Sequence, residues 1–475
     1  MSAAGARLLV GAPASGGGKT TFTCGLLQAL VRRGLRVQAC KCGPDYIDPL
    51  FHTEVIGAPS RNLDLFFSSR EQLRDLVAES AATSDIVVVE GAMGYYDGIA
   101  VSADASAWDV ARTTQTPVVL VVDGRGRAQS IAAEVQGFAR FRDPSMVAGV
   151  VLNRVDEALY PRLKEMLQAE TGLPVLGYLP YLPDCSLESR HLGLVTAAEV
   201  DGLRAKLDLL AETMERTLDI DALLRLAATA SRLESSQTRA ILGGAGEARG
   251  VEGPSAGSDA PQPAPTIAIA RDGAFCFYYA DTLRLLERLG ARLAFFSPLH
   301  DAALPAGSSG LYLGGGYPEL HARELSENTA MRSSIAAAIG AGMPTIAECG
   351  GFLYLHERLE GEDGAEYPQV GSIPARAFRT GRLGRFGYVT LRAQGDGLLA
   401  AAGDELRAHE FHYWDSTQPG TAFRAQKPQS TRSWECCIST PTLHAGFPHL
   451  YLPAHPQAAR RFVDACRVFA AGEGA

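Results

Sequence analysis

Short apolar runs alternate with helical patterns along most of this chain, and this alternation constrains its fold more than any other feature. Each run is continuous, rich in β-branched residues and closed by a turn-forming or polar residue, and the helical pattern of residues 21–33 stops at Gly34. Continuous apolar runs indicate strands buried on both faces, which is typical of a parallel sheet covered by helices. In the first half of the chain, the predicted strands are residues 8–11, 37–40, 86–90, 118–123, 147–153 and 175–179.

The alternation is interrupted once and then resumes, which predicts two α/β domains. Residues 203–233 are helical in pattern, and residues 235–265 are rich in Gly, Ala, Ser and Pro without apolar periodicity, as in a flexible linker. A chain of 475 residues also exceeds what one hydrophobic core usually organises. We therefore expect domains at residues 1–234 and 266–475. The strand patterns of the second are residues 266–270, 293–296, 311–313 and 345–347.

The composition limits which kinds of molecule this protein is expected to bind. The chain has 44 basic and 53 acidic residues and a net charge of −9, which weighs against binding nucleic acid or an anionic membrane. Its nine cysteines lack paired metal spacing, and the first residues lack the pattern of a signal peptide. No apolar run approaches the length of a membrane span. We expect a cytoplasmic protein with small-molecule substrates. The sequence does not determine its oligomeric state, and a homodimer is possible.

A glycine-rich loop between the first strand and the first helix predicts a nucleotide site. Its glycines let backbone N–H groups surround phosphate oxygens at a helix N-terminus, Lys19 would reach the outer phosphates of ATP, and the Thr20 hydroxyl would hold Mg²⁺. Pro13 stands where the strict motif has Gly. Ala14 stands where partition-type switch ATPases carry a second Lys, which disfavours a dimeric ATP switch. The loop residues expected to bind the nucleotide are Ser15, Gly16, Gly18, Lys19, Thr20 and Thr21.

The metal also needs a carboxylate. Glu90 and Asp123 each end a predicted strand, and Glu90 is favoured because the glycine-rich loop that contains Asp97 follows it.

A further polar segment follows the second predicted strand, at the carboxyl edge where open α/β sheets bind ligands. It carries a cation, two carboxylates and a phenol, a set suited to hold a metal and orient an acyl phosphate. We expect Asp45 to be a metal ligand together with Thr20 and Glu90. The residues expected to face the substrate or intermediate are Lys41, Tyr46, Asp48 and Asp97.

Residues 343–353 read as strand, sharp turn and helix, with Cys349 at the turn. A thiol in that position is exposed above the sheet near a helix N-terminus, which favours the thiolate. The Gly350 N–H is a candidate oxyanion donor, and the loop of residues 314–319, with Gly315, is a candidate second donor. A thiol nucleophile also needs a base. Four histidines remain open for that role: His409, His412, His444 and His449.

Taken together, these motifs resemble those of the cobyrinate a,c-diamide synthases of the cobalamin pathway, over nearly the whole chain apart from the linker. A Gln-Asn-Met segment marks the related cobyric acid synthases, and residues 43–46 lack it. The matching segments are residues 15–21, 41–49, 60–64, 90–98, 150–154, 189–194, 270–275, 315–319, 347–351 and 409–413.

The resemblance implies an α/β protein with two coupled activities. The N-terminal domain would be a dethiobiotin-synthetase-like phosphate-loop parallel sheet that phosphorylates a carboxylate with MgATP, with Asn153 at the adenine. The C-terminal domain would be a flavodoxin-like class I glutamine amidotransferase, in which Cys349 attacks glutamine and His449 is the catalytic base. Tyr451 replaces the usual third carboxylate, so Glu410 is a candidate partner for the base. Cations for the acidic substrate would come from Arg154, Arg190 and His191.

Two alternatives remain within and outside the enzyme class. Hydrogenobyrinate and nickel-sirohydrochlorin a,c-diamide synthases share the same motifs. An ATP-driven scaffold with an inactive amidase module is disfavoured by Ala14 and by the intact turn around Cys349.

Overall fold

The chain divides into two compact units, Met1–Thr238 and Arg239–Ala475. The computed structural model describes residues 5–185, 197–233 and 264–472. The motif at residues 189–194, with the candidate cations Arg190 and His191, lies outside the described residues, as do residues 235–263 of the expected linker. The division between the units falls within that stretch.

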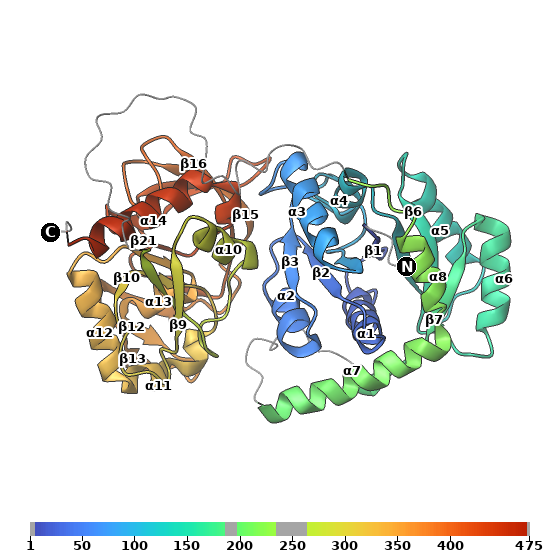
Figure 1. Cartoon of the computed structure of the whole chain (residues 1–475), viewed down its shortest axis with the longest axis horizontal. Coiled ribbons are helices and arrows are strands. Elements are labelled where there is room, and N and C mark those ends of the chain that lie inside the picture. The colour runs from blue at the N-terminus through green and yellow to red at the C-terminus, as the bar shows by residue number, and fades with distance from the viewer. Residues whose placement is uncertain (1–4, 186–196, 234–263, 473–475) are drawn as a thin grey trace. The chain divides into compact units, whose positions relative to one another are not determined.

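A seven-stranded, fully parallel sheet forms the centre of the N-terminal unit, in the order β3-β2-β4-β1-β5-β6-β7 (Figure 1). Six of its strands follow the apolar runs of the sequence, as is typical of strands buried on both faces, but β3 was not predicted because Ser60, Arg61 and Asn62 are polar although buried. One difference matters for the site: β2 extends to Cys42, so Lys41 belongs to the strand. The strands are β1 (Arg7–Gly11), β2 (Val37–Cys42), β3 (Ser60–Leu63), β4 (Ile86–Glu90), β5 (Val118–Asp123), β6 (Val147–Asn153) and β7 (Val175–Leu179).

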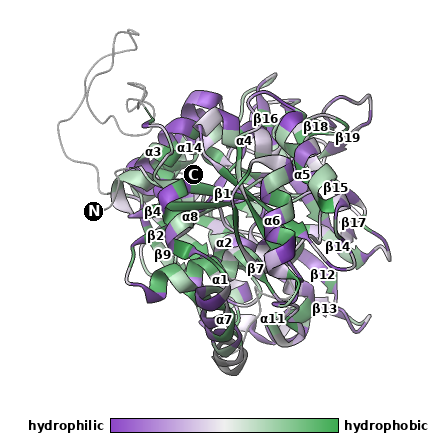
Figure 2. Cartoon of the chain, turned by 90° about the vertical axis from the view of Figure 1, so that its right-hand side faces the viewer, coloured by the Kyte–Doolittle hydropathy of each residue, from purple (hydrophilic) through white to green (hydrophobic). Residues whose placement is uncertain are grey.

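Helices cover both faces of this sheet. One apolar core lies under α1, α7 and α8, and a second lies under α3, α4, α5 and α6. Figure 2 shows apolar strands enclosed by helices whose outer surfaces are hydrophilic. The helices are α1 (Lys19–Arg32), α2 (Ile47–Phe51), α3 (Arg70–Thr83), α4 (Ala107–Thr114), α5 (Ser130–Arg140), α6 (Tyr160–Thr171), α7 (Ala197–Thr217) and α8 (Ile220–Ala227).

The helical pattern of residues 203–233 is two helices and not one. The chain leaves α7 at Leu218, which pairs with Gly177 of β7, and the Asp219 side chain then caps α8 by accepting from the Ala222 N–H. This N-terminal cap restarts the helix in a new direction.

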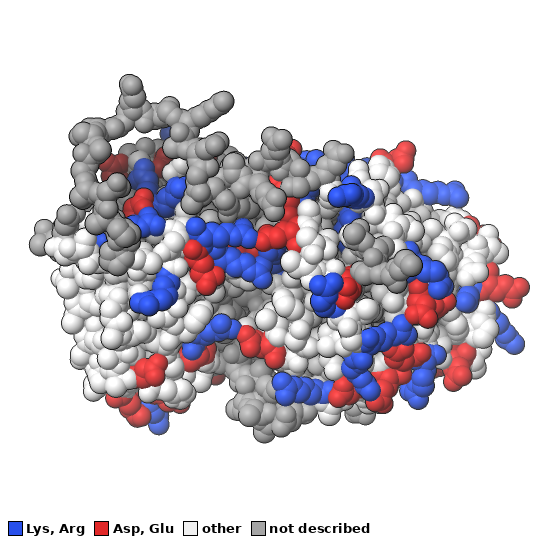
Figure 3. Space-filling model, viewed as in Figure 1, with Lys and Arg blue, Asp and Glu red and all other residues white. Residues whose placement is uncertain are grey.

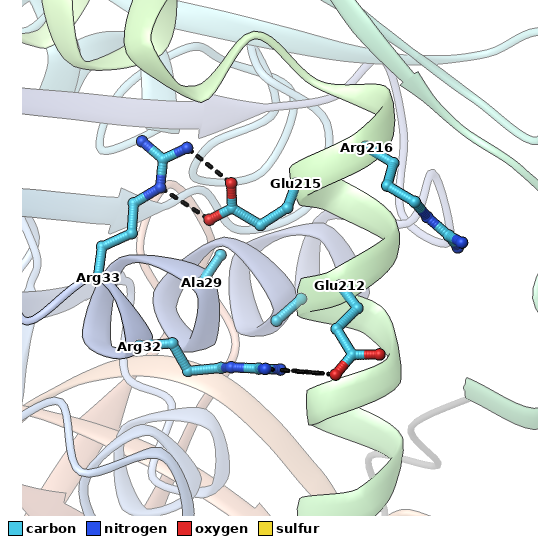
Figure 4. A pocket seen from close by; sticks show the side chains of 7 residues that line it. Ala29, Arg32, Arg33, Glu212, Glu215 and Arg216 are labelled. Atoms are coloured by element: carbon cyan, nitrogen blue, oxygen red, sulfur yellow. Dashed lines mark hydrogen bonds and ion pairs between the residues drawn. The ribbon is translucent and has the colours of Figure 1, made fainter.

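Helix α7 packs across α1 at a glycine. A Cβ atom on Gly25 would lie 2.6 Å from Leu210 Cγ and 2.7 Å from Met214 Cε, so the helices approach over bare backbone. Ion pairs join the same two helices beside a shallow groove (Figure 4). Arg33 pairs with Glu215 and Arg32 with Glu212, at nitrogen–oxygen distances of 2.6 Å and 3.2 Å. Four of the charged side chains that line the groove are therefore already paired with each other.

A six-stranded sheet forms the centre of the C-terminal unit, in the order β20-β21-β11-β10-β8-β9, parallel except for β20. Its two faces pack into separate apolar cores. The strands are β8 (Thr266–Ala270), β9 (Arg292–Phe296), β10 (Ser308–Leu313), β11 (Thr345–Glu348), β20 (Ile438–Ser439) and β21 (Leu443–Gly446), and the helices of the unit are α10 (Ala280–Arg288), α11 (Ala322–Glu327), α12 (Thr329–Gly340), α13 (Gly350–Tyr354) and α14 (Pro456–Ala470).

Two smaller sheets complete this unit. One, β13-β12-β14-β17, is mixed, and the other, β19-β18-β15-β16-β22, is antiparallel. Their strands are β12 (His356–Glu360), β13 (Glu366–Pro368), β14 (Ile373–Arg379), β15 (Arg385–Ala393), β16 (Glu405–His412), β17 (Trp414–Ser416), β18 (Phe423–Gln426), β19 (Ser433–Cys436) and β22 (His449–Leu450).

Basic and acidic side chains are interspersed on the face drawn in Figure 3. None of the described helices is long and apolar enough to cross a membrane.

Candidate functional site

The glycine-rich loop lies between β1 and α1, as the sequence predicts. Gly16 and Gly18 have φ angles of 74° and 91°, in the left-handed region that favours glycine. A Cβ atom on Gly18 would lie 2.2 Å from Asn153 Nδ2, and the same nitrogen donates a hydrogen bond to Gly17 O. The end of β6 therefore supports the loop from below.

Lys19, at the start of α1, is held by backbone carbonyls. Its ammonium donates to Ala14 O at 3.1 Å and to Met93 O. Burial, followed by the charge of Lys41, lowers the pKa of Lys19 to about 8. A buried ammonium held by two backbone carbonyls at the start of a helix is well placed to receive an anion.

Glu90, at the end of β4, joins this loop to the polar segment after β2. Its Oε1 accepts from the Thr20 hydroxyl and from Lys41 Nζ, both at 2.7 Å, and its side chain is fully buried. Burial alone would raise the pKa of Glu90, but Lys41 and then His52 outweigh it and hold that pKa below its ordinary range. The carboxylate is thus kept ionised beside Thr20.

Lys41 also contacts Asp48, so one ammonium bridges two buried carboxylates. Burial and the charge of Glu90 raise the pKa of Asp48 to about 8. Asp48 does not lie on a loop, as the sequence suggested, but on the short helix α2. The helix turns its carboxylate back toward β2.

The other members of the predicted set have separate roles in the fold. Asp45 Oδ1 accepts from the N–H groups of Ile47 and Asp48, so Asp45 caps α2, while its Oδ2 lies 3.9 Å from Lys41 Nζ. Tyr46 is half-buried at the N-terminus of the same helix. Asp97 accepts from the Gly94 N–H in the loop after β4.

Asp123, the rival to Glu90, pairs with Arg154 at 3.0 Å, and Arg154 also donates to Gly16 O. This pair supports the back of the phosphate loop. Glu90 is the carboxylate that contacts Thr20, which favours it over Asp123 as the metal ligand.

Sequence reasoning missed His52. Its Nε2 lies 3.4 Å from Glu90 Oε2, and its Nδ1 lies 3.4 Å from Ser60 Oγ, with the ring fully buried. A signal was available, because His52 follows Asp48 by four residues and so lies on the same side of a helix.

The oxygens of Thr20 and Glu90 have the chemistry that Mg²⁺ prefers. In the part of the chain that the structure describes, no three His, Cys, Asp or Glu side chains form a ready metal cage. Mg²⁺ typically needs none, because it is held by one or two protein oxygens together with substrate phosphates and water.

In the C-terminal unit, Cys349 occupies the turn between β11 and α13. Its backbone is strained, with φ 46° and ψ −102°, and its N–H donates to Gly446 O at 2.8 Å. The turn must be tight because a Cβ atom on Gly351 would lie 2.1 Å from Leu313 O. The nucleophile turn predicted from the sequence is present.

The state of the thiol differs from the expectation. Burial and then the charge of Glu319 raise the pKa of Cys349; the Gly350 N–H opposes them, and Glu348 and Glu410 add smaller increases. The sequence suggested a thiolate at a helix N-terminus. Helix α13 has only five residues, and desolvation outweighs it.

The two candidate oxyanion loops converge beside the thiol. A Cβ atom on Gly315 would lie 2.4 Å from His449 Cε1, and one on Gly350 would lie 3.0 Å from Gly316 N. The loop after β10 therefore touches both the turn and one of the four candidate bases.

Of the other three histidines, His412 and His444 have separate contacts, and His409 lies beside His449. Burial lowers the pKa of His412 and of His444 to about 4; His412 bonds to Trp414 O and stacks on Phe447, and His444 packs edge-on against Phe423. His409 is paired with His449 across β16 and β22. Burial, followed by His449 and Lys427, lowers the pKa of His409 to about 3. The geometry favours His449 as the base.

Glu410 does not face His449. In antiparallel strands, directly paired residues share a face, so His449 lies on the face of His409 and Glu410 points to the opposite one. The suggestion that Glu410 assists the base is therefore wrong. The carboxylate beside His449 is Glu348, whose Oε2 lies 3.8 Å from His449 Nδ1.

Comparisons with known proteins also assign a nucleotide site to the N-terminal unit and a glutamine amidotransferase site to the C-terminal unit. Residues 8–195 match the CobQ/CobB/MinD/ParA nucleotide binding domain, and residues 266–455 match the CobB/CobQ-like glutamine amidotransferase domain. The match ranges fall within the N-terminal and C-terminal units respectively.

Curated relatives match across both units. The chain is 40% identical to the cobyrinate a,c-diamide synthase of Salmonella typhimurium over 460 residues, which are 95% of this chain and 96% of that protein. It is also 40% identical to the synthase of that name from Thermoplasma volcanium, over 86% of this chain and 85% of that protein. The hydrogenobyrinate a,c-diamide synthase of Thermobifida fusca is 39% identical, over 97% of this chain and 96% of that protein. The chain belongs to the cobyrinate a,c-diamide synthase family.

Proposed function

We propose that this protein uses ATP and glutamine to convert the a and c carboxylates of cobyrinate into carboxamides, as a step of cobalamin biosynthesis in the cytoplasm. Residues 1–234 form the amide synthetase domain, residues 235–265 the linker and residues 266–475 the glutamine amidotransferase domain. One observation supports this proposal: the same chain contains two sites. In the first, a phosphate loop lies beside a buried, ionised carboxylate, and in the second, a cysteine in a sharp turn lies near a histidine.

In the N-terminal unit, a substrate carboxylate attacks the γ-phosphate of ATP and ADP leaves. The loop from Ser15 to Thr21 cradles the phosphates, Lys19 neutralises their charge, and Asn153 borders the adenine site. Thr20, Glu90 and Asp45 would hold Mg²⁺, which supplies charge neutralisation on the phosphates. Lys41, Tyr46, Asp48 and Asp97 would orient the acyl phosphate, and Arg154, Arg190 and His191 are candidate cations for the acidic substrate.

In the C-terminal unit, Cys349 attacks the side-chain amide of glutamine, and His449 takes the thiol proton and delivers it to the leaving ammonia. The N–H groups of Gly315 and Gly350 stabilise the oxyanion. Water then releases glutamate. Ammonia attacks the acyl phosphate, phosphate leaves, and an amide remains.

The test is to incubate the protein with MgATP, glutamine and cobyrinic acid, and to follow corrinoid mass, glutamate and ADP together. We expect two successive amidations. In Cys349→Ala, glutamine should no longer support the reaction, whereas ammonium chloride should.

The Thermobifida fusca relative is named a hydrogenobyrinate a,c-diamide synthase, so the same assay should be run in parallel with metal-free hydrogenobyrinic acid. Nickel-sirohydrochlorin is the third substrate to test. If the protein amidates either of these tetrapyrroles in preference to cobyrinic acid, the assigned substrate changes, but the proposed chemistry of the two sites stands. Absence of glutamate release with every tetrapyrrole would reject the amidotransferase and support an ATP-driven scaffold.

A further inference from the structure

Glu348 is a buried carboxylate that the mechanism above does not use. It ends β11 immediately before Cys349, and only 2% of it is exposed. An ionisable side chain at such a position needs polar partners to offset the loss of water. The partners it has in this structure suggest a role.

Both oxygens of Glu348 are directed at the segment that carries the base. Oε1 accepts from the Leu450 N–H at 3.0 Å, and Leu450 directly follows His449 in β22. Oε2 lies 3.8 Å from His449 Nδ1 and accepts from the Tyr312 hydroxyl at 3.0 Å. One carboxylate therefore anchors the backbone beside the base and faces its ring.

The opposite side of His449 is also defined. The ring packs against Gly315, where a Cβ atom would lie 2.4 Å from Cε1, and its strand pairs with β16 at His409. A negative group at Nδ1 favours a proton on that nitrogen and makes Nε2 the nitrogen that accepts the proton of a thiol. The usual third carboxylate, two residues after the histidine, is absent because Tyr451 occupies that position.

We propose that Glu348 is the positioning residue that holds His449 in the orientation and tautomer needed to activate Cys349. The proposal rests on the glutaminase activity put forward above. In this arrangement the carboxylate that assists the base does not come from the position two residues after His449. It comes from Glu348, which directly precedes Cys349 on a strand about a hundred positions earlier in the chain.

The test compares glutaminase kinetics of the wild type, Glu348→Gln, Tyr312→Phe and Glu410→Gln. Glu348→Gln keeps the shape and removes the charge, and we expect kcat to fall by about 10²- to 10⁴-fold, as when the carboxylate of such a triad is made an amide. KM for glutamine should stay within about twofold, because Glu348 is buried and is proposed to act through His449. Tyr312→Phe, which removes one donor to Glu348, should lower kcat by less.

Glu410→Gln is the comparison variant, because Glu410 is also a buried carboxylate near the thiol but points to the face of β16 opposite to His409 and its pairing partner His449. Removing the Glu410 charge affects the thiol but not the orientation of His449, so kcat should fall far less than in Glu348→Gln. Ammonia-supported amidation should be unchanged in all four proteins, which verifies that the N-terminal unit is intact. A Glu348→Gln enzyme with wild-type kcat, or one that loses no more activity than Glu410→Gln, overturns the role of Glu348 alone. A wild type that releases no glutamate overturns the proposed function and this role with it.

Discussion

At the residue scale, the thiol of Cys349 is the group whose chemistry departs most from the sequence-based expectation. Its position in a sharp turn was predictable from the glycines that follow it. Its environment was not, because the charges of Glu319 and Glu410, which raise its pKa, come from other parts of the chain. The resting enzyme is expected to hold a protonated thiol that needs its base, so glutamine binding and proton transfer must accompany attack.

This state predicts the pH dependence of alkylation. Because the pKa of Cys349 is raised above that of an ordinary thiol, the reactive thiolate is scarce at neutral pH and increases only as pH rises beyond 9. Inactivation of glutaminase by iodoacetamide should therefore keep accelerating through this range. A rate that levels off below pH 8 would mean that the thiolate is already formed. Cys349→Ala identifies labelling at other cysteines.

Gly18 allows a second prediction at this scale. In Gly18→Ala, the new Cβ would lie 2.2 Å from Asn153 Nδ2 at a φ of 91°, so the phosphate loop cannot keep its shape. ATP binding, measured by calorimetry, should be lost. Gly34→Ala is the control: its φ is also positive, at 77°, but no atom lies within 4 Å. It should cost about 1 kcal/mol of stability and leave ATP affinity unchanged. Equal loss of ATP binding in both variants would contradict this reading.

At the scale of elements, the packing of α7 on α1 depends on the absence of a side chain at Gly25. Gly25→Ala places a methyl group against Leu210 and Met214 at less than 3 Å, and we expect destabilisation by about 1–3 kcal/mol from overpacking. Gly137→Ala is the matched variant, in the interior of α5, where nothing lies within 4 Å. It should stabilise by up to about 1 kcal/mol, because alanine is the better helix former. Urea unfolding measures both changes, and destabilisation in Gly137→Ala would show that helix propensity was misjudged.

Buried strands could be predicted from the sequence better than short, partly exposed ones, for a physical reason. Strands β4 to β7 are apolar up to their last residues and could be predicted directly from the sequence. Strands such as β13 and β19 are short, partly exposed and polar, and their pairing depends on neighbours distant in sequence. The two small sheets of the C-terminal unit were therefore not predicted.

At the scale of the whole molecule, the two compact units each have their own apolar cores. Such units typically unfold in separate transitions. Scanning calorimetry should resolve two, and a non-hydrolysable ATP analogue with Mg²⁺ at a hundred times its Kd should stabilise one of them by about 2.7 kcal/mol. Gly25→Ala should lower that same transition only. A single transition that shifts as a whole would mean that the units fold as one.

Local patterns were sufficient for the features that depend on a few consecutive residues. The phosphate loop, the cysteine turn and the buried parallel strands each require particular residue types at fixed spacing, because backbone geometry or burial permits little else there. The resemblance built on these motifs led to the family that the comparisons confirm. It also led to His449.

Only the tertiary structure decided which side chains meet. The contacts of Glu90 with Lys41 and His52 depend on the order in which strands pair, and the contact of Glu348 with His449 joins strands about a hundred residues apart. The assignment of Glu410 failed because a strand places neighbouring residues on opposite faces, and the sequence does not say which face meets the site. Proximity across a sheet follows from register, and register is a property of the whole folded unit.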